Sequence, residues 1–292
     1  MAAGLACITG CHGLPSPAAG QNDVIIAAGR RFHTGTRVVL WNETGGYDGY
    51  QGGPLAPRPV LAKQAAGQDS RGELAALQEN VDQLVLHYDG CGLSRLCFEK
   101  LRERGLSVHF LLDLDGTVYQ ALDLRERALH ATIANDRSIG IELANVGAFP
   151  PGEPGELAAW YRRDGPAPTV ITVPEKAGAP RFLDRGFVGR PIRPGPVRGA
   201  IQGQDLIQYD FTVEQYRALA RLTAALGRVF PLIRTDYPRD ALGRLITQKL
   251  PDKEWENFHG ILGHFHIQAN KVDPGPALQW DKLINEVQRL AK

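Results

Sequence analysis

Residues that can bind a metal and move protons gather near the end of the chain, in Gly263–Pro276, which reads GHFHIQANKVDPGP. His264 and Asp273 lie nine positions apart across a polar loop, so a folded loop can bring an imidazole and a carboxylate to one point. Both are zinc ligands in proteins, and a catalytic zinc needs a third protein ligand and keeps its fourth position for water. Alone, a motif of this kind is more often a turn than a metal site.

The end of this stretch is predicted to be stiff. Asp273-Pro274-Gly275-Pro276 fits a type II turn, with Pro274 at its second position and Gly275 at the third, where φ must be positive. The proline after Asp273 also biases that residue toward an extended backbone. The turn therefore aims the carboxylate of Asp273 in a fixed direction.

A third ligand stands at the end of an apolar segment elsewhere in the chain. Gln83–Tyr88 reads QLVLHY, which predicts a short strand, and the turn Asp89-Gly90 follows it. His87 is thus placed where a strand ends and a loop begins, a position that can line a site. Considered alone, a histidine hydrogen-bonded at the rim of the sheet is the simpler interpretation.

A carboxylate is expected in a hollow on a second strand. Ser138–Asn145 reads SIGIELAN and alternates, so that its large apolar residues point one way. Glu142 points the other way, between Gly140 and Ala144, and such small neighbours leave space around it. The alternative is a plain salt bridge from Glu142 to Arg137 or Arg125.

The remaining pattern predicts elements around one core. Helices are expected over 71–82, over 94–104 with Ser94 as the N-cap, over 212–230 and over 281–291; Thr212 and Gln215 fit a capping box. SVHFLLDL and TVYQALDL predict a hairpin around Asp115-Gly116. Strands and helices that alternate in this way indicate an α/β (α+β) class with a mixed central sheet flanked by helices.

Two stretches depart from this pattern. Residues 23–60 predict an N-terminal β arm, and the Pro/Gly-rich residues 148–210 predict an insertion of hairpins or ordered loop on the rim. Residues 1–22 are expected to be a tail or a truncated signal, in which Cys11 ends a segment similar to a lipoprotein processing box. A frayed terminus of small residues is the alternative.

Composition excludes several classes. The 292 residues are 43% hydrophobic and 22% charged with a net charge of +1, so a nucleic-acid partner that binds by charge neutralisation is not expected. The sequence has no run of eighteen apolar residues, hence no membrane span is predicted. Four cysteines are too few for a disulfide scaffold, although Cys91 and Cys97 could form a local bridge.

Four segments, in order, carry a resemblance to a known family: VLHYDG, SVHFLLDLDGTVYQ with His130 downstream, SIGIELAN, and GHFHIQANKVDPGPALQW. Together they resemble the zinc-dependent N-acetylmuramoyl-L-alanine amidases related to peptidoglycan recognition proteins. The resemblance covers roughly residues 80–145 and 212–290 and implies a single amidase domain over 23–292.

The resemblance assigns roles to individual residues. It makes His87, His264 and Asp273 the zinc ligands, Glu142 the catalytic glutamate and Lys271 the catalytic lysine. His109 and His130 match histidines near the family's site and are candidates for substrate binding. His266, where some relatives carry aspartate, is the rival ligand. The interval from His264 to Asp273 is one residue shorter than in the anhydro-muropeptide amidases, which affects the expected loop conformation.

These residues imply hydrolysis of the amide between the lactyl group of N-acetylmuramic acid and L-alanine. Glu142 would act as general base and then acid, and zinc and Lys271 would stabilise the oxyanion. The alternatives are a non-catalytic peptidoglycan-binding module and a zinc hydrolase of another amide. Peptidoglycan or muropeptide as partner implies a location in the cell envelope, periplasm or outside the cell, with a lipid anchor at Cys11 or a cytoplasmic location as alternatives. Aromatic groove walls are expected, with Tyr88, Trp160 and Trp280 as candidates.

Overall fold

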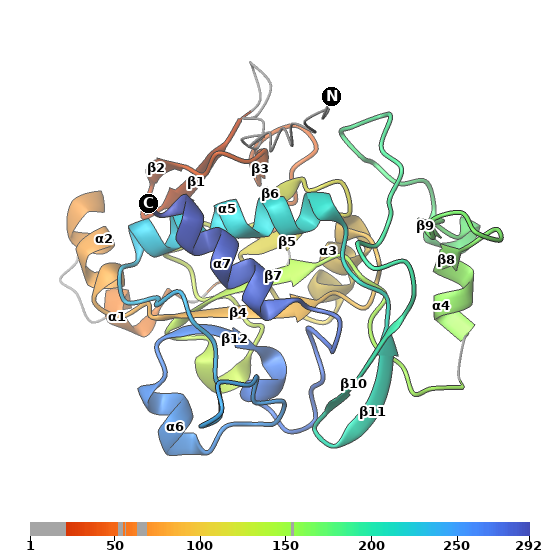
Figure 1. Ribbon diagram of the computed structural model, residues 1–292. Helices are drawn as coiled ribbons and strands as arrows, with labels where there is room; N and C mark the ends of the chain where they lie inside the picture. Colours follow the sequence, from red (N-terminus) through yellow and green to blue (C-terminus); the bar gives the residue numbers. More distant parts are fainter. Residues whose placement is uncertain (1–21, 52–54, 56, 63–68, 153–154) are drawn as a thin grey trace, which may run out of the picture.

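The computed structural model describes residues 22–51, 55, 57–62, 69–152 and 155–292. Its centre is a six-stranded sheet with the order β12-β4-β7-β5-β6-β3 (Figure 1). Neighbouring strands are parallel except for the antiparallel pair β5–β6. The predicted mixed sheet is confirmed. The strands are β3 (Val38–Leu40), β4 (Gln83–Tyr88), β5 (Phe110–Leu112), β6 (Val118–Gln120), β7 (Ser138–Leu143) and β12 (Gly260–Gly263).

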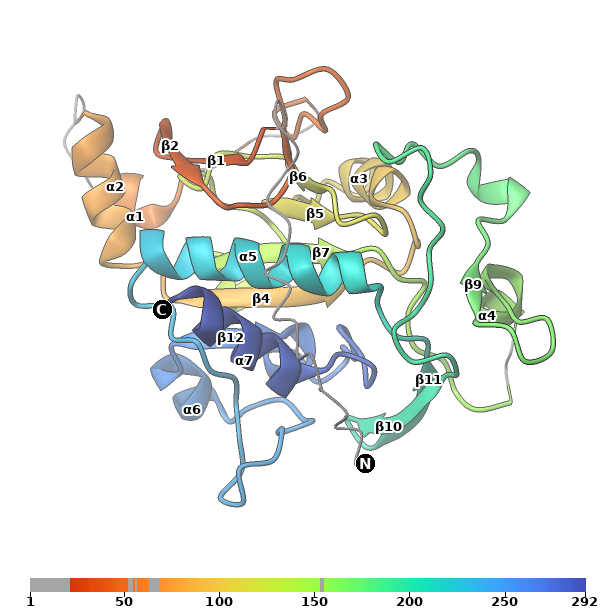
Figure 2. The ribbon, with the colours of Figure 1, turned by 45° about the horizontal axis from the view of Figure 1, so that its top comes forward.

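Helices cover both faces of the sheet. On one face lie α5 (Val213–Val229) and α7 (Trp280–Leu290), which are drawn in front of the strands in Figures 1 and 2. They form the main core with the side chains that point to this face, among them Leu84, Ile139 and Ile141. The other face is covered in part by α3 (Ser94–Glu103), and by a second cluster around Val85 and Trp255, the latter on α6 (Asp252–Asn257).

The alternation in β7 places its two kinds of residue as predicted. Ile139, Ile141 and Leu143 all belong to the main core on the helix side. Gly140 and Glu142 therefore face the opposite side, because side chains along a strand alternate. The predicted hollow beside Glu142 thus lies on the face that α5 and α7 leave open.

The N-terminal arm forms a hairpin of β1 (Val24–Ala27) and β2 (Arg30–His33), after which β3 joins the edge of the main sheet. Two short helices follow, α1 (Pro59–Ala62) and α2 (Ser70–Gln78), and α2 is capped by the Asp69 side chain. These elements lie at one edge of the molecule (Figure 2). The division at 23–60 stays a prediction.

The segment 148–210 lies at the edge of the molecule opposite α1 and α2 (Figures 1 and 2). Its ends meet, because Phe149 and Ile207 exchange both backbone hydrogen bonds at 2.9 and 2.8 Å. Hairpin structure is present, as predicted for a rim insertion, while its boundaries stay a prediction. The segment holds α4 (Gly155–Trp160), the pair β8 (Tyr161–Arg162) and β9 (Val170–Ile171), and the pair β10 (Val197–Ile201) and β11 (Gln204–Gln208).

Of three local predictions, one is wrong, one is confirmed and one is supported in part. The positive φ predicted for Gly275 is present (82°), and the Gly275 N–H donates to the Val272 carbonyl, while the type II turn over 273–276 stays a prediction. Ser94 is the first residue of α3 rather than its N-cap, since the chain enters the helix from the extended Leu93. The capping box of Thr212 and Gln215 is confirmed.

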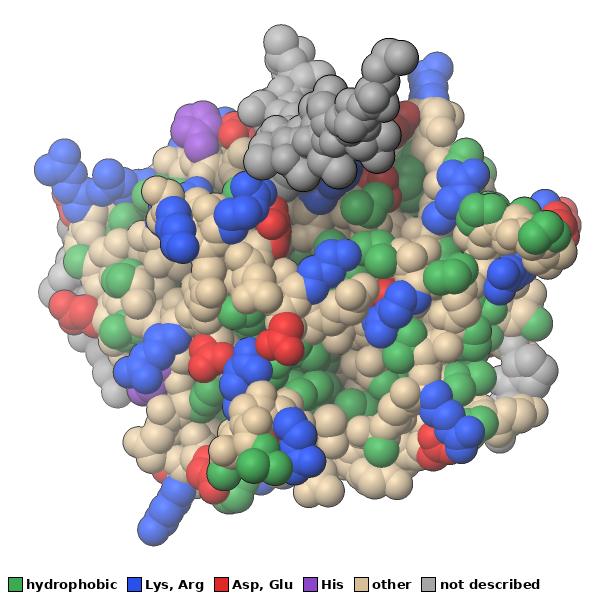
Figure 3. Space-filling view, viewed as in Figure 1, with side chains coloured by type: hydrophobic (Ala, Val, Ile, Leu, Met, Phe, Trp, Pro, Cys, Tyr) green, Lys and Arg blue, Asp and Glu red, His purple; other side chains and the backbone are tan. Residues whose placement is uncertain are grey.

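The molecular surface carries both signs of charge. On the face drawn in Figure 3, basic and acidic side chains are interspersed without a large patch of one sign. Within the described residues, no helix combines the length and apolar character that a bilayer crossing needs.

Candidate metal-dependent active site

Three side chains from distant parts of the sequence converge on one point. Asp273 Oδ2 lies 2.8 Å from His87 Nδ1 and 3.0 Å from His264 Nδ1, and the two nitrogens are 3.1 Å apart. All three residues are buried. In the described part of the chain, this is the one group of three or more histidine, cysteine or acidic side chains with the geometry to hold a metal ion.

The sheet explains this convergence. β4 and β12 are parallel neighbours, so their carboxyl ends lie at the same edge of the sheet. His87 is near the end of β4, and His264 opens the 3-10 helix η3 (His264–His266) directly after β12. Asp273 then returns to the same edge through the 264–275 loop, where the Phe265 N–H donates to the Asp273 carbonyl at 3.2 Å. Ligands of open α/β sheets commonly bind at this edge.

The second ring nitrogens of the two histidines are also held. His264 Nε2 lies 2.6 Å from Gln268 Oε1, and His87 Nε2 lies 3.0 Å from His130 Nδ1. An amide oxygen accepts only, so His264 Nε2 carries the proton, and its Nδ1 lone pair is directed to the centre of the group. Metal-binding histidines usually donate from their other nitrogen in this way.

The protonation states of the group suit a cation. Burial lowers the pKa of His87 to about 4, although the hydrogen bond to Asp273 opposes the shift. Burial would raise the pKa of Asp273, but its interactions with the neighbouring His264 and His87 side chains outweigh this effect and hold the pKa below its usual range. At neutral pH, His87 is thus neutral and Asp273 ionised, as metal coordination requires.

Glu142 stands beside this group without a hydrogen-bond partner. β7 pairs with β4 in a register that sets Glu142 opposite His87, and Oε2 of the buried carboxyl has no partner in the structure. Burial, with the nearby Asp273 carboxylate, raises its pKa well above the usual value. The alternative salt bridges are wrong, because Arg137 pairs with Asp82, and Arg125 with Glu73 and Asp123.

A cleft of about 330 Å³ opens over these residues. Lys271 lines it and is close enough to Glu142 for its charge to lower the pKa of that carboxyl. Tyr88, half-buried, lines it as well. Six of the seven predicted site residues thus line one cleft: His87, His130, Glu142, His264, Lys271 and Asp273.

His130 supports His87 from behind. Its ring packs edge-on against the His87 ring with centroids 5.2 Å apart, and its Nε2 lies 3.2 Å from Ser138 Oγ. Gly140 makes room for it, because a Cβ at this position would lie 2.7 Å from His130 Nδ1. Gly140 therefore packs directly against the imidazole ring of His130.

His109 lies deeper than the cleft, which it does not line. Its Nδ1 accepts from the Gly140 N–H at 3.1 Å, and its Nε2 contacts the Glu126 carbonyl at 3.1 Å. Arg58, also fully buried, lies 3.1 Å from the same Nε2 and donates to four backbone carbonyls, including Ser138 at 2.8 Å. The sequence analysis did not identify Arg58 as a site residue. The only feature that could have indicated it is that a charged residue stands among the short apolar segments of the N-terminal arm.

The rival ligand His266 points away from the group. Its Nδ1 accepts from the Gly263 N–H at 2.9 Å and its Nε2 donates to the Ile246 carbonyl at 2.7 Å. Both ring nitrogens of His266 are thus hydrogen-bonded to backbone groups.

Cys91 and Cys97 are free thiols, with no disulfide between them.

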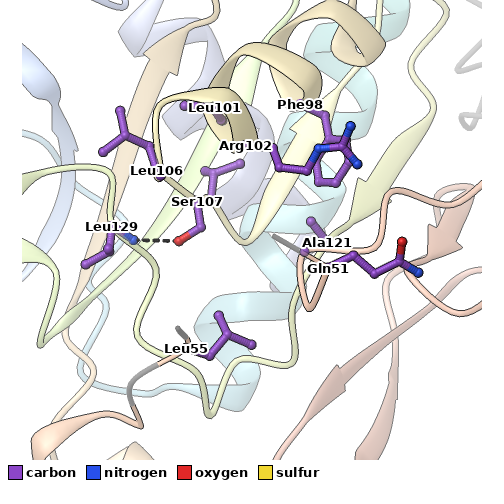
Figure 4. A pocket seen from close by; sticks show the side chains of 12 residues that line it. Gln51, Leu55, Phe98, Leu101, Arg102, Leu106, Ser107, Ala121 and Leu129 are labelled. Carbon is purple, nitrogen blue, oxygen red and sulfur yellow. Dashed lines mark hydrogen bonds between the residues drawn. The ribbon is translucent and has the colours of Figure 1, made fainter. Parts of the chain in front are cut away.

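Of the three aromatic residues proposed as groove walls, Tyr88 is half-buried, whereas Trp160 and Trp280 are buried. Trp280 is 4% exposed and packs in the main core against Tyr237, so it forms no wall of the cleft. Trp160 is 3% exposed. A separate pocket of about 90 Å³ shares Leu101 and Leu106 with the cleft (Figure 4), but none of the predicted site residues lines it.

One family model and several solved structures are similar to this chain. The family model described as N-acetylmuramoyl-L-alanine amidase matches residues 77–276. Among solved structures, a selenomethionine derivative of AmpD is 19% identical, covering 72% of this chain and 86% of that chain with a TM-score of 0.35. The amidase LysC from Clostridium intestinale is 12% identical (86% and 97% covered, TM-score 0.39). A Drosophila PGRP-LB variant in complex with tracheal cytotoxin is 12% identical (82% and 89%, TM-score 0.36). No curated protein sequence matches the chain.

Proposed function

Since the chain belongs to the N-acetylmuramoyl-L-alanine amidase family, we propose that it uses zinc to hydrolyse the amide between the lactyl group of N-acetylmuramic acid and L-alanine in peptidoglycan or muropeptides. One observation carries the proposal. The ligand atoms of His87, His264 and Asp273 lie 2.8–3.1 Å apart beside a Glu142 carboxyl whose Oε2 is buried and without a partner.

The three ligand atoms fit a zinc ion. Bonds of 2.0–2.1 Å in tetrahedral geometry put two ligand atoms about 3.3 Å apart. The distances of 2.8, 3.0 and 3.1 Å need only a small outward movement of side chains to match. Two neutral imidazoles and one carboxylate are also a known catalytic zinc set, which leaves a coordination position for water.

Each remaining residue has a task that its position supports. Bound zinc would act as a Lewis acid and make a water molecule acidic enough to react at neutral pH. Glu142, with a raised pKa, accepts the proton of the attacking water and returns it to the leaving alanine amine. The Lys271 ammonium in the same cleft offsets the negative charge that develops on the carbonyl oxygen.

The decisive test compares metal content and cleavage in one purified sample. Wild type is expected to hold one zinc per chain and to release a new L-alanine amine from muropeptides. Asp273→Ala removes the carboxylate that faces both histidines and should lose both. Asp252→Ala, an exposed residue on α6, is the matched control and should keep both.

The other outcomes are equally clear. Zinc without cleavage of any wall fragment would favour a peptidoglycan-binding module. No zinc in a folded wild-type sample would overturn the metal site. Cleavage of other amides but not of muropeptides would indicate a hydrolase of different specificity.

The proposed substrate also implies a place of action. Peptidoglycan lies in the cell envelope, so we expect the protein to act there or after secretion. An anchor at Cys11 stays a prediction, because that residue lies outside the described residues.

A further inference from the structure

A second hollow lies on the N-terminal arm, away from the catalytic cleft. It has a volume of about 570 Å³, and we call it the arm groove. The residues that matter for its chemistry are Arg31, Trp41, Asn42, Tyr50, Asp123 and Glu126. It shares no lining residue with the catalytic cleft. Most of its wall lies outside residues 77–276, the part of the chain that matches the amidase family.

The strand directions place the arm groove at the far edge of the sheet. Trp41 directly follows β3, and Asp123 comes shortly after β6. β3 and β6 are parallel to each other but run opposite to β4, β5 and β7. The ends of β3 and β6 therefore lie where β4 and β7 begin, whereas His87 and Glu142 stand near the ends of β4 and β7.

Two aromatic side chains form an angled wall of the arm groove. Tyr50 is 38% exposed, and Trp41 is half-buried with part of its ring against the main core. Their ring centroids are 5.6 Å apart and their planes meet at 48°. Because the rings are tilted, neither covers the face of the other. Aromatic rings that stay accessible in a hollow are typical of binding surfaces.

This wall is held in place before any ligand arrives. The Tyr50 hydroxyl donates to Glu126 Oε1 at 3.3 Å and accepts from the Asp123 N–H at 3.3 Å. The buried Asp123 carboxylate accepts from the N–H groups of Ala28 and Gly29, both at 2.7 Å. Tyr50 and the β1–β2 hairpin are thus both fixed to the segment after β6. A preorganised site loses less conformational entropy when it binds.

Polar groups with no partner stand beside the rings. The exposed side chains of Arg31 and Asn42 form no hydrogen bond or ion pair with any residue that the structure describes. The arginine offers several N–H donors, and the amide offers donors and an acceptor. Ile26 and Leu40, both buried, add an apolar floor. The arm groove therefore presents hydrogen-bonding groups next to apolar surface.

The charges of the lining indicate a neutral ligand. The acidic residues Glu43, Asp123 and Glu126 outnumber the basic residues Arg31 and Arg125. Arg125 is also already paired with Asp123. This excess of negative charge disfavours a phosphate or a polycarboxylate. The lining suits a molecule with C–H faces for the rings, hydroxyl groups, and an amide with a small apolar end.

We propose that the arm groove binds a glycan of β-1,4-linked N-acetylated hexosamines. Trp41 and Tyr50 contact the C–H faces of the sugar rings. Arg31 and Asn42 donate to the acetamide carbonyl and to hydroxyl oxygens, and the acetamide methyl packs on the apolar floor. This site goes beyond the proposed function, because it shares no residue with the cleft. In an amidase that acts on peptidoglycan, it would be a second hold on the polymer, and two linked sites retain a polymer longer than one.

The test is calorimetry with penta-N-acetylchitopentaose, which contains no amide to L-alanine, so amidase activity plays no part. Wild type is expected to bind it. Tyr50→Ala removes the exposed ring and should weaken binding about tenfold. Arg31→Ala removes a charged donor and should also weaken binding about tenfold. Cellopentaose has the same linkage without acetamides and should bind wild type about tenfold more weakly.

Matched controls separate loss of the site from loss of the fold. Arg30→Ala changes the neighbouring exposed residue of β2, which does not line the arm groove. Leu242→Ala changes a side chain that is 75% exposed on another surface. Both should bind as wild type. Arg31→Ala should keep the wild-type Tm, because the Arg31 side chain has no contact partner among the described residues.

Three results would overturn the proposal. They are absence of chitopentaose binding by wild type, equal binding by both arm variants, and equal affinity for cellopentaose. Binding that survives in both arm variants but is lost in Asp273→Ala would place the sugar in the catalytic cleft and would equally overturn the arm groove.

The arm groove and the proposed function fail separately. Muropeptide cleavage without chitopentaose binding overturns the arm groove and leaves the amidase. Chitopentaose binding that Arg31→Ala weakens, in a protein that cleaves no muropeptide, supports the arm groove and overturns the proposed function.

Discussion

The buried Glu142 is costly unless it has a task. Its Oε2 lacks a hydrogen-bond partner, and a buried unpaired polar group costs on the order of 1–3 kcal/mol. Glu142 lies opposite His87 in the β4–β7 register, so the unpaired carboxyl stands beside the His87, His264 and Asp273 group. Groups with strongly shifted pKa values in clefts are typical of functional sites.

Glu142→Gln tests the proton transfer. The amide keeps the size of the side chain but cannot accept the proton, so kcat should fall about 10²–10⁴-fold. Zinc content, measured by atomic absorption, should stay at one per chain. Near-full activity with zinc still bound would remove Glu142 from the mechanism.

Lys271→Ala tests the charge in the cleft. Loss of a preorganised donor to the developing oxyanion costs about 2.7–4 kcal/mol, which corresponds to a fall in kcat of about 10²–10³-fold. Lys253→Ala, on the exposed surface of α6, is the control in the same kinetic assay. An unchanged kcat in the Lys271 variant would contradict the assigned role.

At the scale of elements, three adjacent strands act together. β12, β4 and β7 are parallel, so one edge of the sheet collects His264 and His87 and brings Glu142 beside them. The same geometry makes the small residue in β7 necessary, because His130 occupies the space where a Cβ of residue 140 would stand.

Gly140→Ala is expected to disturb the site through His130. The buried ring must shift away from His87 Nε2 and Ser138 Oγ, at a cost of about 1–3 kcal/mol typical of overpacking. Urea unfolding should show this loss, and titration should show weaker zinc binding. Gly195→Ala, where a Cβ would meet nothing within 4 Å, is the control; identical behaviour of the two variants would show that His130 is not held there.

At the scale of the whole molecule, the fold is built independently of the metal group. The main core lies between the sheet and the α5–α7 layer, whereas the ligand atoms lie at the end of the strands. A metal there would link β4 to the loop after β12 without replacing any core contact. The molecule should therefore survive loss of the ion.

Chelation should lower stability without unfolding the protein. A ligand that binds only the folded state at 100 times its Kd contributes about 2.7 kcal/mol, so Tm should fall by several degrees. Asp273→Ala should show no response to the chelator in the same melting experiment. A wild-type Tm and activity that persist after complete zinc removal would contradict the metal site.

Much of this protein was determined by local sequence pattern. The alternation of large apolar and other residues along 138–145 predicted which face of the strand carries Glu142. The capping box of Thr212 and Gln215 predicted where α5 begins. Apolar QLVLHY fixed a buried strand that ends near His87. These features depend on neighbours in the chain, so the residues alone specify them.

Only the tertiary structure decided which distant groups meet. It placed His130 behind His87, His109 and the buried Arg58 below the cleft, and His266 against the backbone, although all are polar residues with similar sequence signals. It also set Trp280 in the core and made the N-terminal arm a wall of the arm groove. Such outcomes depend on strand order and on packing between segments far apart in sequence, which no local pattern records.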